Sequence, residues 1–208
     1  MHSRDDDFRA LTERVRGELK GHGQWALYER TVTFARQGTS TARDELARTL
    51  ELPGHPLWAR ELAAFSLGTL GDRRAFETLV LLLNYRDPVR AATAAEALAR
   101  LGDPRTARAA AALATNPLRT SYSLHAVRLL GRLRAPESVP ALISALERLV
   151  QGPDHHWAVA AACIEALGAM GDDRAVPVLS SARVFPELRE PAGGALARIW
   201  RESPPSSA

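Results

Sequence analysis

Small and apolar residues recur along this chain at helical spacing, and a short polar phrase interrupts them at nearly regular intervals. Between residues 88 and 101 they stand at steps of three, at Ala92, Ala95, Leu98 and Leu101. This spacing places them on one face of a helix with 3.6 residues per turn. A second helical stretch, residues 104–115, follows directly. The pattern therefore predicts a pair of helices joined by a short turn.

The polar phrase occurs four times, beginning at Leu70, Leu101, Leu133 and Met170. We take its second residue as a reference position, and the four reference residues are Gly71, Gly102, Arg134 and Gly171. They lie 31, 32 and 37 residues apart, a period typical of proteins that stack helix pairs. One pair alone buries too little apolar surface to offset its backbone entropy. The sequence thus predicts an all-α fold, an α-solenoid in which helix pairs form a right-handed superhelix.

Two columns of residues recur before the reference positions. Eight residues before them stand small side chains, Ala63, Ala94, Ala126 and Cys163, and four before them stand leucines, Leu67, Leu98, Leu130 and Leu167. We expect the small column to let neighbouring first helices approach closely and the leucines to fill the core. Cys163 is expected to be a core residue, because a lone cysteine cannot form an internal disulfide.

The turn residues have structural roles that follow from their chemistry. Glycine at the reference position suits the left-handed conformation that ends a helix. The aspartates that follow, Asp72, Asp103 and Asp172, are expected to cap the next helix with a side-chain oxygen. Pro136 suits the first turn of a helix where the phrase departs from this pattern.

The same periodicity predicts one domain, residues 1–202. A capping helix is expected at residues 5–20 and a terminal half repeat at 187–201, closed by Trp200. Pro191 and the Gly193-Gly194 pair predict that this last helix is short or irregular. The repeats are expected at about 24–51, 56–84, 87–115, 118–150 and 155–183, and residues 203–208 are expected to be a disordered tail.

One stretch resembles a known repeat family. The run from Glu165 to Leu179, EALGAMGDDRAVPVL, is similar to the HEAT-like repeat of the bilin-lyase type, and Asp87-Pro88-Val89-Arg90 resembles the opening of that repeat. The resemblance covers about residues 56–185. It implies a solenoid of HEAT-like helix pairs. Proteins with such repeats include chromophore lyases, DNA-repair enzymes and adaptors without catalytic activity, so the resemblance leaves the activity open.

The second helices commonly line the concave side of such solenoids, and arginines recur there. Arg74, Arg105, Arg108 and Arg174 are candidates for binding carboxylates or phosphates. Alternatively, these arginines pair with Glu77, Asp103, Glu137 and Asp173 and form a solvated surface of little energetic value.

Aromatic and histidine residues give a second candidate. Trp58 and Trp157 follow His55 and His155, which share a repeat register, and two such pairs would form a binding ledge. Alternatively, these residues pack beneath the preceding turn. The longer third repeat adds an inserted loop near residues 149–157, and such loops often carry specific function.

Few catalytic signals are present. The histidines show no zinc-ligand spacing, and no nucleophile elbow or phosphate-binding glycine loop occurs, so no metal or cofactor is expected. Trp25 and Glu29 are the nearest match to the aromatic and carboxylate pair of HEAT-like DNA glycosylases, although that family has aspartate. No apolar run reaches the roughly 18 residues of a membrane span, and the acidic N-terminus does not resemble a signal peptide, so a cytoplasmic location is expected.

These observations favour a non-catalytic scaffold or adaptor that binds an acidic segment or helix of a protein partner along the concave face. The net charge of +3 comes almost entirely from arginine, since Lys20 is the only lysine. Such a charge is compatible with nucleic acid without requiring it. The alternative is therefore a DNA- or RNA-binding protein, including a base-excision enzyme of the glycosylase type; a bilin lyase rests on the repeat resemblance alone.

Overall fold

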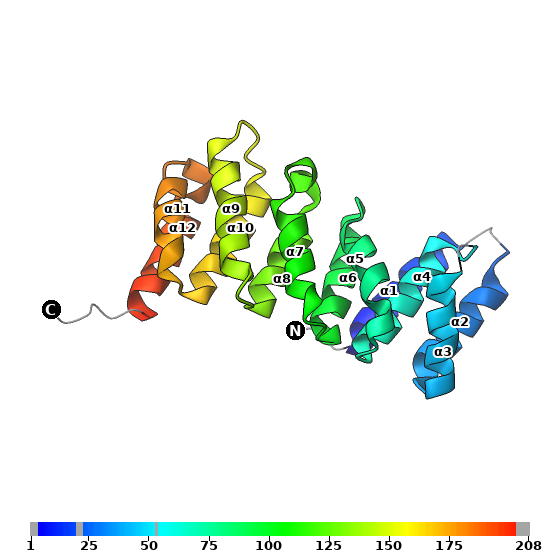
Figure 1. Ribbon diagram of the computed structural model, residues 1–208. Helices are drawn as coiled ribbons and strands as arrows, with labels where there is room; N and C mark the ends of the chain where they lie inside the picture. Colours follow the sequence, from blue (N-terminus) through cyan, green and yellow to red (C-terminus); the bar gives the residue numbers. More distant parts are fainter. Residues whose placement is uncertain (1–3, 20–22, 53, 203–208) are drawn as a thin grey trace. The chain divides into compact units, whose positions relative to one another are not determined.

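The computed structural model describes residues 4–19, 23–52 and 54–202, and every regular element within these ranges is a helix (Figure 1). The predicted all-α class is confirmed. Contacts between residues divide the chain into two compact units, residues 1–106 and 107–208, which are described separately below. The prediction of a single domain stays a prediction, and the tail predicted at 203–208 lies outside the described residues.

The first unit contains two complete helix pairs and the first helix of a third. Helices α2, α4 and α6 are the first helices of their pairs, and α4 packs against both α2 and α6. The second helices α3 and α5 both pack against α4. The elements are α1 (Arg4–Glu18), α2 (Trp25–Gln37), α3 (Ser40–Glu51), α4 (Leu57–Thr69), η1 (Arg73–Ala75), α5 (Phe76–Leu83) and α6 (Pro88–Leu101).

The second unit repeats this arrangement. Its first helices are α8, α10 and α12, and α10 packs between the other two, while the second helices α9 and α11 contact each other. The elements are α7 (Arg105–Thr115), which begins at the end of the first unit, η2 (Pro117–Tyr122), α8 (Leu124–Leu133), α9 (Ser138–Gln151), α10 (Trp157–Met170), η3 (Asp173–Ala175), α11 (Val176–Ala182) and α12 (Pro186–Glu202). Consecutive pairs stacked in this way are the arrangement of an α-solenoid. The handedness of the superhelix stays a prediction.

The two predicted core columns are buried. The leucines and small residues of both columns are at most 2% exposed, and Cys163 is completely buried. A second set of small residues brings the first helices even closer together. A Cβ atom added to Gly68 would lie 3.3 Å from the Cβ of Ala97, and one added to Gly131 would lie 2.9 Å from that of Ala166. These glycines stand three residues before the reference position, a column that the sequence reasoning missed.

The turns have the predicted chemistry. Gly71, Gly102 and Gly171 have φ angles of 65–76°, the left-handed region that suits glycine. Arg134 takes the same conformation at φ 49° and also donates a hydrogen bond to the carbonyl oxygen of Ala169. The aspartate caps are confirmed, because an Oδ1 atom of Asp72, Asp103 and Asp172 accepts a hydrogen bond from the backbone N–H two residues later.

Two expectations for the last helix are wrong. α12 continues through Pro191 and the glycine pair without a break. Its residues Ala192, Ala195, Leu196 and Ile199 are buried, so packing against α10 and α11 outweighs the low intrinsic helix propensity. Trp200 does not close the array, since 58% of its surface is exposed.

Candidate functional site

The N-terminal helix α1 lies on the first helices. The sequence predicts a cap at the end of the array, yet α1 contacts α4 and reaches α6. The ring of Phe8 stacks on that of Phe65 in α4, with centroids 6.5 Å apart. Leu11 and Val15 are buried beneath the helix. Burial of this apolar stripe against α4 stabilises α1 in this place.

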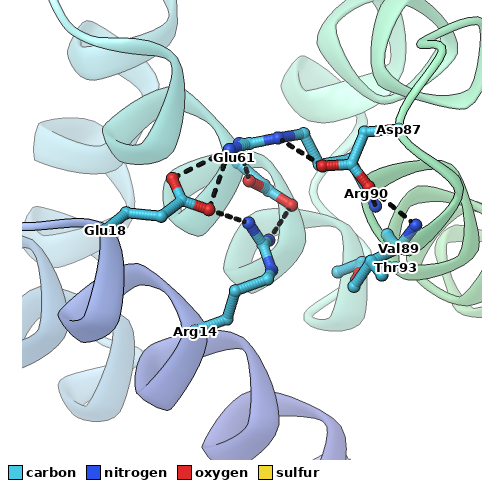
Figure 2. A network of polar contacts seen from close by, with 7 residues as sticks. All are labelled: Arg14, Glu18, Glu61, Asp87, Val89, Arg90 and Thr93. Carbon is cyan, nitrogen blue, oxygen red and sulfur yellow. Dashed lines mark hydrogen bonds and ion pairs between the residues drawn. The ribbon is translucent and has the colours of Figure 1, made fainter.

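A network of ion pairs fastens α1 to the same surface (Figure 2). At its centre is Glu61 of α4, which is only 1% exposed. One carboxylate oxygen of Glu61 accepts a hydrogen bond from Nη2 of Arg14 in α1, and the other accepts one from Nη1 of Arg90 in α6 at 2.6 Å. Glu18 of α1 closes the network, since it pairs with Nη1 of Arg14 at 2.7 Å and with Nη2 of Arg90 at 2.8 Å.

The network balances a buried charge. Burial raises the pKa of Glu61 above its ordinary value, and the guanidinium groups of Arg14 and Arg90 oppose this rise without cancelling it. Burial also disfavours the charge of Arg90, but the carboxylates of Glu61 and Glu18 leave its pKa raised. Removing one member of such a set leaves an uncompensated buried charge. The network therefore holds α1 in one position, and the sequence reasoning missed Glu61 entirely.

A second ion pair lies nearer the start of α1. Asp7 accepts a hydrogen bond from Nη2 of Arg100 in α6 at 2.7 Å, and Arg100 also pairs with Glu96 at 3.0 Å. α1 thus contacts α6 at two places, through Glu18 near its end and Asp7 near its start. The first-helix face of the first unit is a surface that binds an amphipathic helix.

The arginines predicted as a binding row are held in their turns. Arg74 donates to both carboxylate oxygens of Asp72 and to Asp44 of α3. Arg174 donates in the same way to Asp172. These bonds lower the pKa of both aspartates below the ordinary value. Each aspartate therefore caps a helix and neutralises the arginine two residues later.

Arg105 follows the same rule with two additions. It donates to Asp103 at 3.0 Å and to Glu77 of α5 at 3.1 Å, and its guanidinium lies 3.9 Å from the centre of the Phe76 ring. Arg108 is exposed on α7. Arg105 has two of the partners that the alternative interpretation named, Asp103 and Glu77. Arg74 and Arg174 are also paired, but with Asp72 and Asp172, which that interpretation did not name. A role of these residues in binding stays a prediction.

The tryptophans predicted to form a binding ledge differ in burial. Trp58 is only 6% exposed and donates from Nε1 to Oε1 of Gln24 at 2.8 Å, beneath the preceding pair. Trp58 therefore packs against the start of α2 and is a buried residue, not an exposed contact. Trp157 and His155 lie in the second unit, half-buried and stacked with centroids 4.4 Å apart, and Phe185 lies 4.7 Å from His155.

The inserted loop between α9 and α10 holds this aromatic cluster in place. Nδ1 of His155 lies 2.8 Å from the carbonyl oxygen of Leu149. His156 has a φ angle of 40°, unusual for a residue other than glycine, and precedes the first residue of α10. Across the root of the loop, Nη1 of Arg148 donates to the carbonyl of Thr115 at 2.6 Å. Contacts of Arg148 before the loop and of His155 near its end therefore hold the loop in place.

The comparisons with known proteins agree with this architecture. Residues 121–197 match the pattern of HEAT repeats, and residues 59–85 match that of the PBS lyase HEAT-like repeat. The chain contains HEAT repeats. Among solved structures, human deoxyhypusine hydroxylase in complex with glycerol is 18% identical, covering 93% of this chain and 84% of its own, with a TM-score of 0.30. No curated protein matches the sequence.

Exposed apolar residues follow the ends of four second helices. Leu52, Tyr85, Leu118 and Val184 stand one to three residues beyond the last residue of α3, α5, α7 and α11. Their exposed fractions are 53, 44, 88 and 73%. We call these four residues the apolar edge. Gln151, the last residue of α9 before the inserted loop, is also exposed.

Two searches of the described ranges bear on chemistry. No group of three or more histidine, cysteine, aspartate or glutamate residues in these ranges is arranged to hold a metal ion. None of the described helices combines the length and apolar character that crossing a membrane requires.

Proposed function

We propose that this chain is a non-catalytic scaffold that binds a protein partner in its second unit, through Leu118 and Val184 of the apolar edge and the inserted loop after α9. Single exposed apolar residues are common on protein surfaces and need no explanation. Exposed apolar residues that follow the ends of neighbouring second helices are different, because stacked repeats can offer them together to one partner. In the second unit, Leu118 and Val184 are the most exposed of these residues.

The paired arginines argue for a different surface from the one expected from sequence. A guanidinium that already binds an aspartate must lose that bond before it can grip a partner's carboxylate, which reduces any net gain. Reversing Arg74, Arg105 and Arg174 would also place a new carboxylate beside each capping aspartate. We therefore place the partner's contact on apolar residues, with the arginines supporting the turns.

The same pairing disfavours nucleic acid as the ligand. Binding to phosphates requires cations that can release counterions from the nucleic acid, and such binding weakens steeply as salt rises. Three arginines of the expected row are instead matched with carboxylates of this chain. A gel-shift titration at low salt is expected to show no complex with DNA or RNA. A salt-sensitive shift would favour the alternative function.

The test of the proposal compares a variant of the second unit with a control in the first unit. Leu118→Glu with Val184→Glu places charges on the apolar edge, while Val89→Glu places one on an exposed valine of the first helix α6. Partners captured by the unchanged chain are purified and titrated against each variant by calorimetry. We expect the edge variant to lose binding and Val89→Glu to retain it. Equal binding by both variants would contradict the proposal.

A further inference from the structure

We propose that the hollow between the turns that precede α9 and α11 binds the side-chain carboxylate of an aspartate or glutamate from a protein partner, through Arg134 and Arg174. The inference rests on the proposed function in one respect, that the carboxylate belongs to a protein. The site is a different one, because the apolar edge lies beyond the opposite ends of the second helices. An ion pair that recurs in the first unit and is incomplete in the second carries the proposal.

In the first unit, each turn arginine binds a second acid besides the aspartate of its own turn. Arg74 donates from Nη1 to Asp44 of α3 at 2.8 Å, and Arg105 donates from Nη1 to Glu77 of α5 at 3.1 Å. Both acids stand six residues after the glycine that follows the first helix of their pair, a place we call the helix position. Both arginines stand three residues after the next such glycine, at the turn position. The second acid therefore comes from the preceding second helix.

The second unit departs from this pairing at one repeat. Its first helix position holds Arg108, and the turn position that follows holds Glu137, so the two charges are again opposite but exchanged. The next helix position holds Pro140, which has no charge, while the turn position that follows holds Arg174. Arg174 is therefore a turn arginine without an acid at the helix position before it.

Arg174 keeps the geometry of its counterparts. Its Nη2 donates to Oδ2 of Asp172 at 2.6 Å, the same distance as between Arg74 and Asp72. The remaining nitrogen, Nη1, binds Asp44 in the case of Arg74, whereas Nη1 of Arg174 has no hydrogen-bond or ion-pair partner among the described residues. Arg174 is thus the exception among the paired arginines of the expected row, because it can take a further carboxylate and keep Asp172.

A hollow of about 390 Å³ lies beside Arg174. Its charged lining consists of Arg134, Arg174 and Asp172, and its other lining residues are apolar. Arg134 donates from Nη2 to the carbonyl oxygen of Ala169, and its Nε and Nη1 have no partner within the described ranges. Two guanidinium groups therefore face one carboxylate that is already paired. One further carboxylate balances this excess of positive charge, and guanidinium groups bind carboxylates through charge-assisted hydrogen bonds.

The probe is N-acetyl-glutamate N-methylamide, whose only charge is the side-chain carboxylate, and the matching glutamine derivative is the neutral control. Both are titrated into the full chain carrying isotope-labelled arginine, and the Nε–Hε signals are followed by NMR. We expect the glutamate derivative alone to give saturable shifts at Arg134 and Arg174. The signals of Arg74 and Arg105 are internal controls and should move less, because Nη1 of each is occupied.

Two substitutions at one residue form a matched pair. Pro140→Glu restores an acid at the helix position and is expected to abolish the saturable shift, because its carboxylate takes the place of the probe. Pro140→Gln changes the same residue without adding charge and should bind the probe as the unchanged chain does. Ser144→Glu, at an exposed residue one turn later on α9, adds the same charge farther along the helix and should also retain binding. Melting curves check that each variant folds.

The variant Pro140→Glu also tests the origin of the carboxylate. We expect it to weaken the partner of the proposed function at least about threefold, the size of one exposed ion pair. Undiminished binding of that partner would contradict the assignment to a protein. The apolar-edge variant Leu118→Glu with Val184→Glu should leave the probe's shifts unchanged, so failure of this site is distinct from failure of the proposed function.

Other results would overturn the site itself. The unchanged chain could give no saturable shift at Arg174, a result that does not depend on any variant, or the control arginines could shift equally, which would indicate unspecific association. Tighter binding of inorganic phosphate than of the glutamate derivative would make the ligand a phosphate. Glu137 is exposed one turn before Pro140. A shift seen only in Glu137→Gln would make this chain's own acid the occupant.

Discussion

Single aspartates in the turns perform two tasks. Asp103 caps the start of α7 through the backbone N–H of Arg105 and also binds that residue's guanidinium. The sequence predicted the cap, because aspartate after a helix-ending glycine is a strong signal. It left open whether Arg105 binds a partner protein or an acid of this chain. A side chain two residues after the aspartate can either turn back to bind it or extend into solvent. The outcome depends on the turn geometry, which brings the two side chains together.

The pH dependence of stability tests this pair. The hydrogen bond from Arg105 lowers the pKa of Asp103 below its ordinary value of 3.8. The folded-state pKa is therefore below the unfolded one, so the pair stabilises the fold above the ordinary value and loses this effect as the pH falls through the folded pKa. We expect Asp103→Asn to lower the free energy of unfolding at pH 7 and to differ less from the unchanged chain below about pH 4.

Urea unfolding at a series of pH values measures this difference. Asp154→Asn, on an exposed aspartate of the inserted loop, is the control and should follow the unchanged chain throughout. A gap between Asp103→Asn and the unchanged chain that stays constant down to pH 3 would show that the carboxylate's charge contributes nothing.

Glu61 shows what pattern reading at the residue scale could not supply. It stands next to Arg60 in a helix, α4, whose other residues are mostly apolar and buried, and an acid in such a helix is a signal for a buried ion pair. Its partners come from helices 47 residues before it and 29 residues after it in sequence. No local spacing predicts such pairs, because they form only when α1 lies on the first helices.

At the scale of elements, the close packing of first helices depends on glycine. The sequence analysis found one column of small residues, which is buried, and missed a second column that contains the glycines. Gly68, Gly131 and Gly168 each face an alanine of the next first helix. Glycine inside a helix usually lowers stability, so its recurrence at one register was the signal that identifies this contact.

Two glycine substitutions in the second unit distinguish the effect of close helix packing from the effect of helix propensity. A Cβ atom at Gly168 would lie 2.6 Å from the Cβ of Ala195 and 2.8 Å from its Cα, whereas one at Gly193 meets nothing within 4 Å. We expect Gly168→Ala to destabilise the fold by about 1–3 kcal/mol through overpacking. Gly193→Ala should stabilise it by up to about 1 kcal/mol, because alanine favours the helix.

Thermal or urea unfolding of the two glycine variants gives both values. The same sign for both substitutions would mean that α10 and α12 do not pack at the distance described.

The continuity of α12 illustrates a limit of local propensity. Proline and paired glycines predict a short or broken helix, and each has an intrinsic cost. Buried residues on both sides of Pro191, Leu188 and Leu196 among them, hold the helix against α10 and α11. Tertiary packing decides such cases, and a single sequence does not reveal it.

At the scale of the whole molecule, periodicity predicted the repeated helix pairs and the two core columns, and the comparisons identify them as HEAT repeats. The position of α1 was not predictable. Its contacts are with α4 and α6, which are distant from it in sequence, and such contacts leave no periodic signal. The proposed binding surface differs from the predicted one for a related reason. The arginine row could be found from its register in the sequence. Which acids pair with these arginines could not, because some of the partners come from adjacent repeats.

The central claim is that α1 lies on the first-helix face of the first unit and is held there by the ion pairs of Glu61. A double-mutant cycle between Arg14 of α1 and Glu61 of α4 tests it most directly. The free energies of unfolding of Arg14→Ala, Glu61→Ala and the double variant are compared with that of the unchanged chain. A coupling energy of about 1–3 kcal/mol is predicted for this contact. Additivity within about 0.5 kcal/mol would contradict it, because α1 would then not lie on this face.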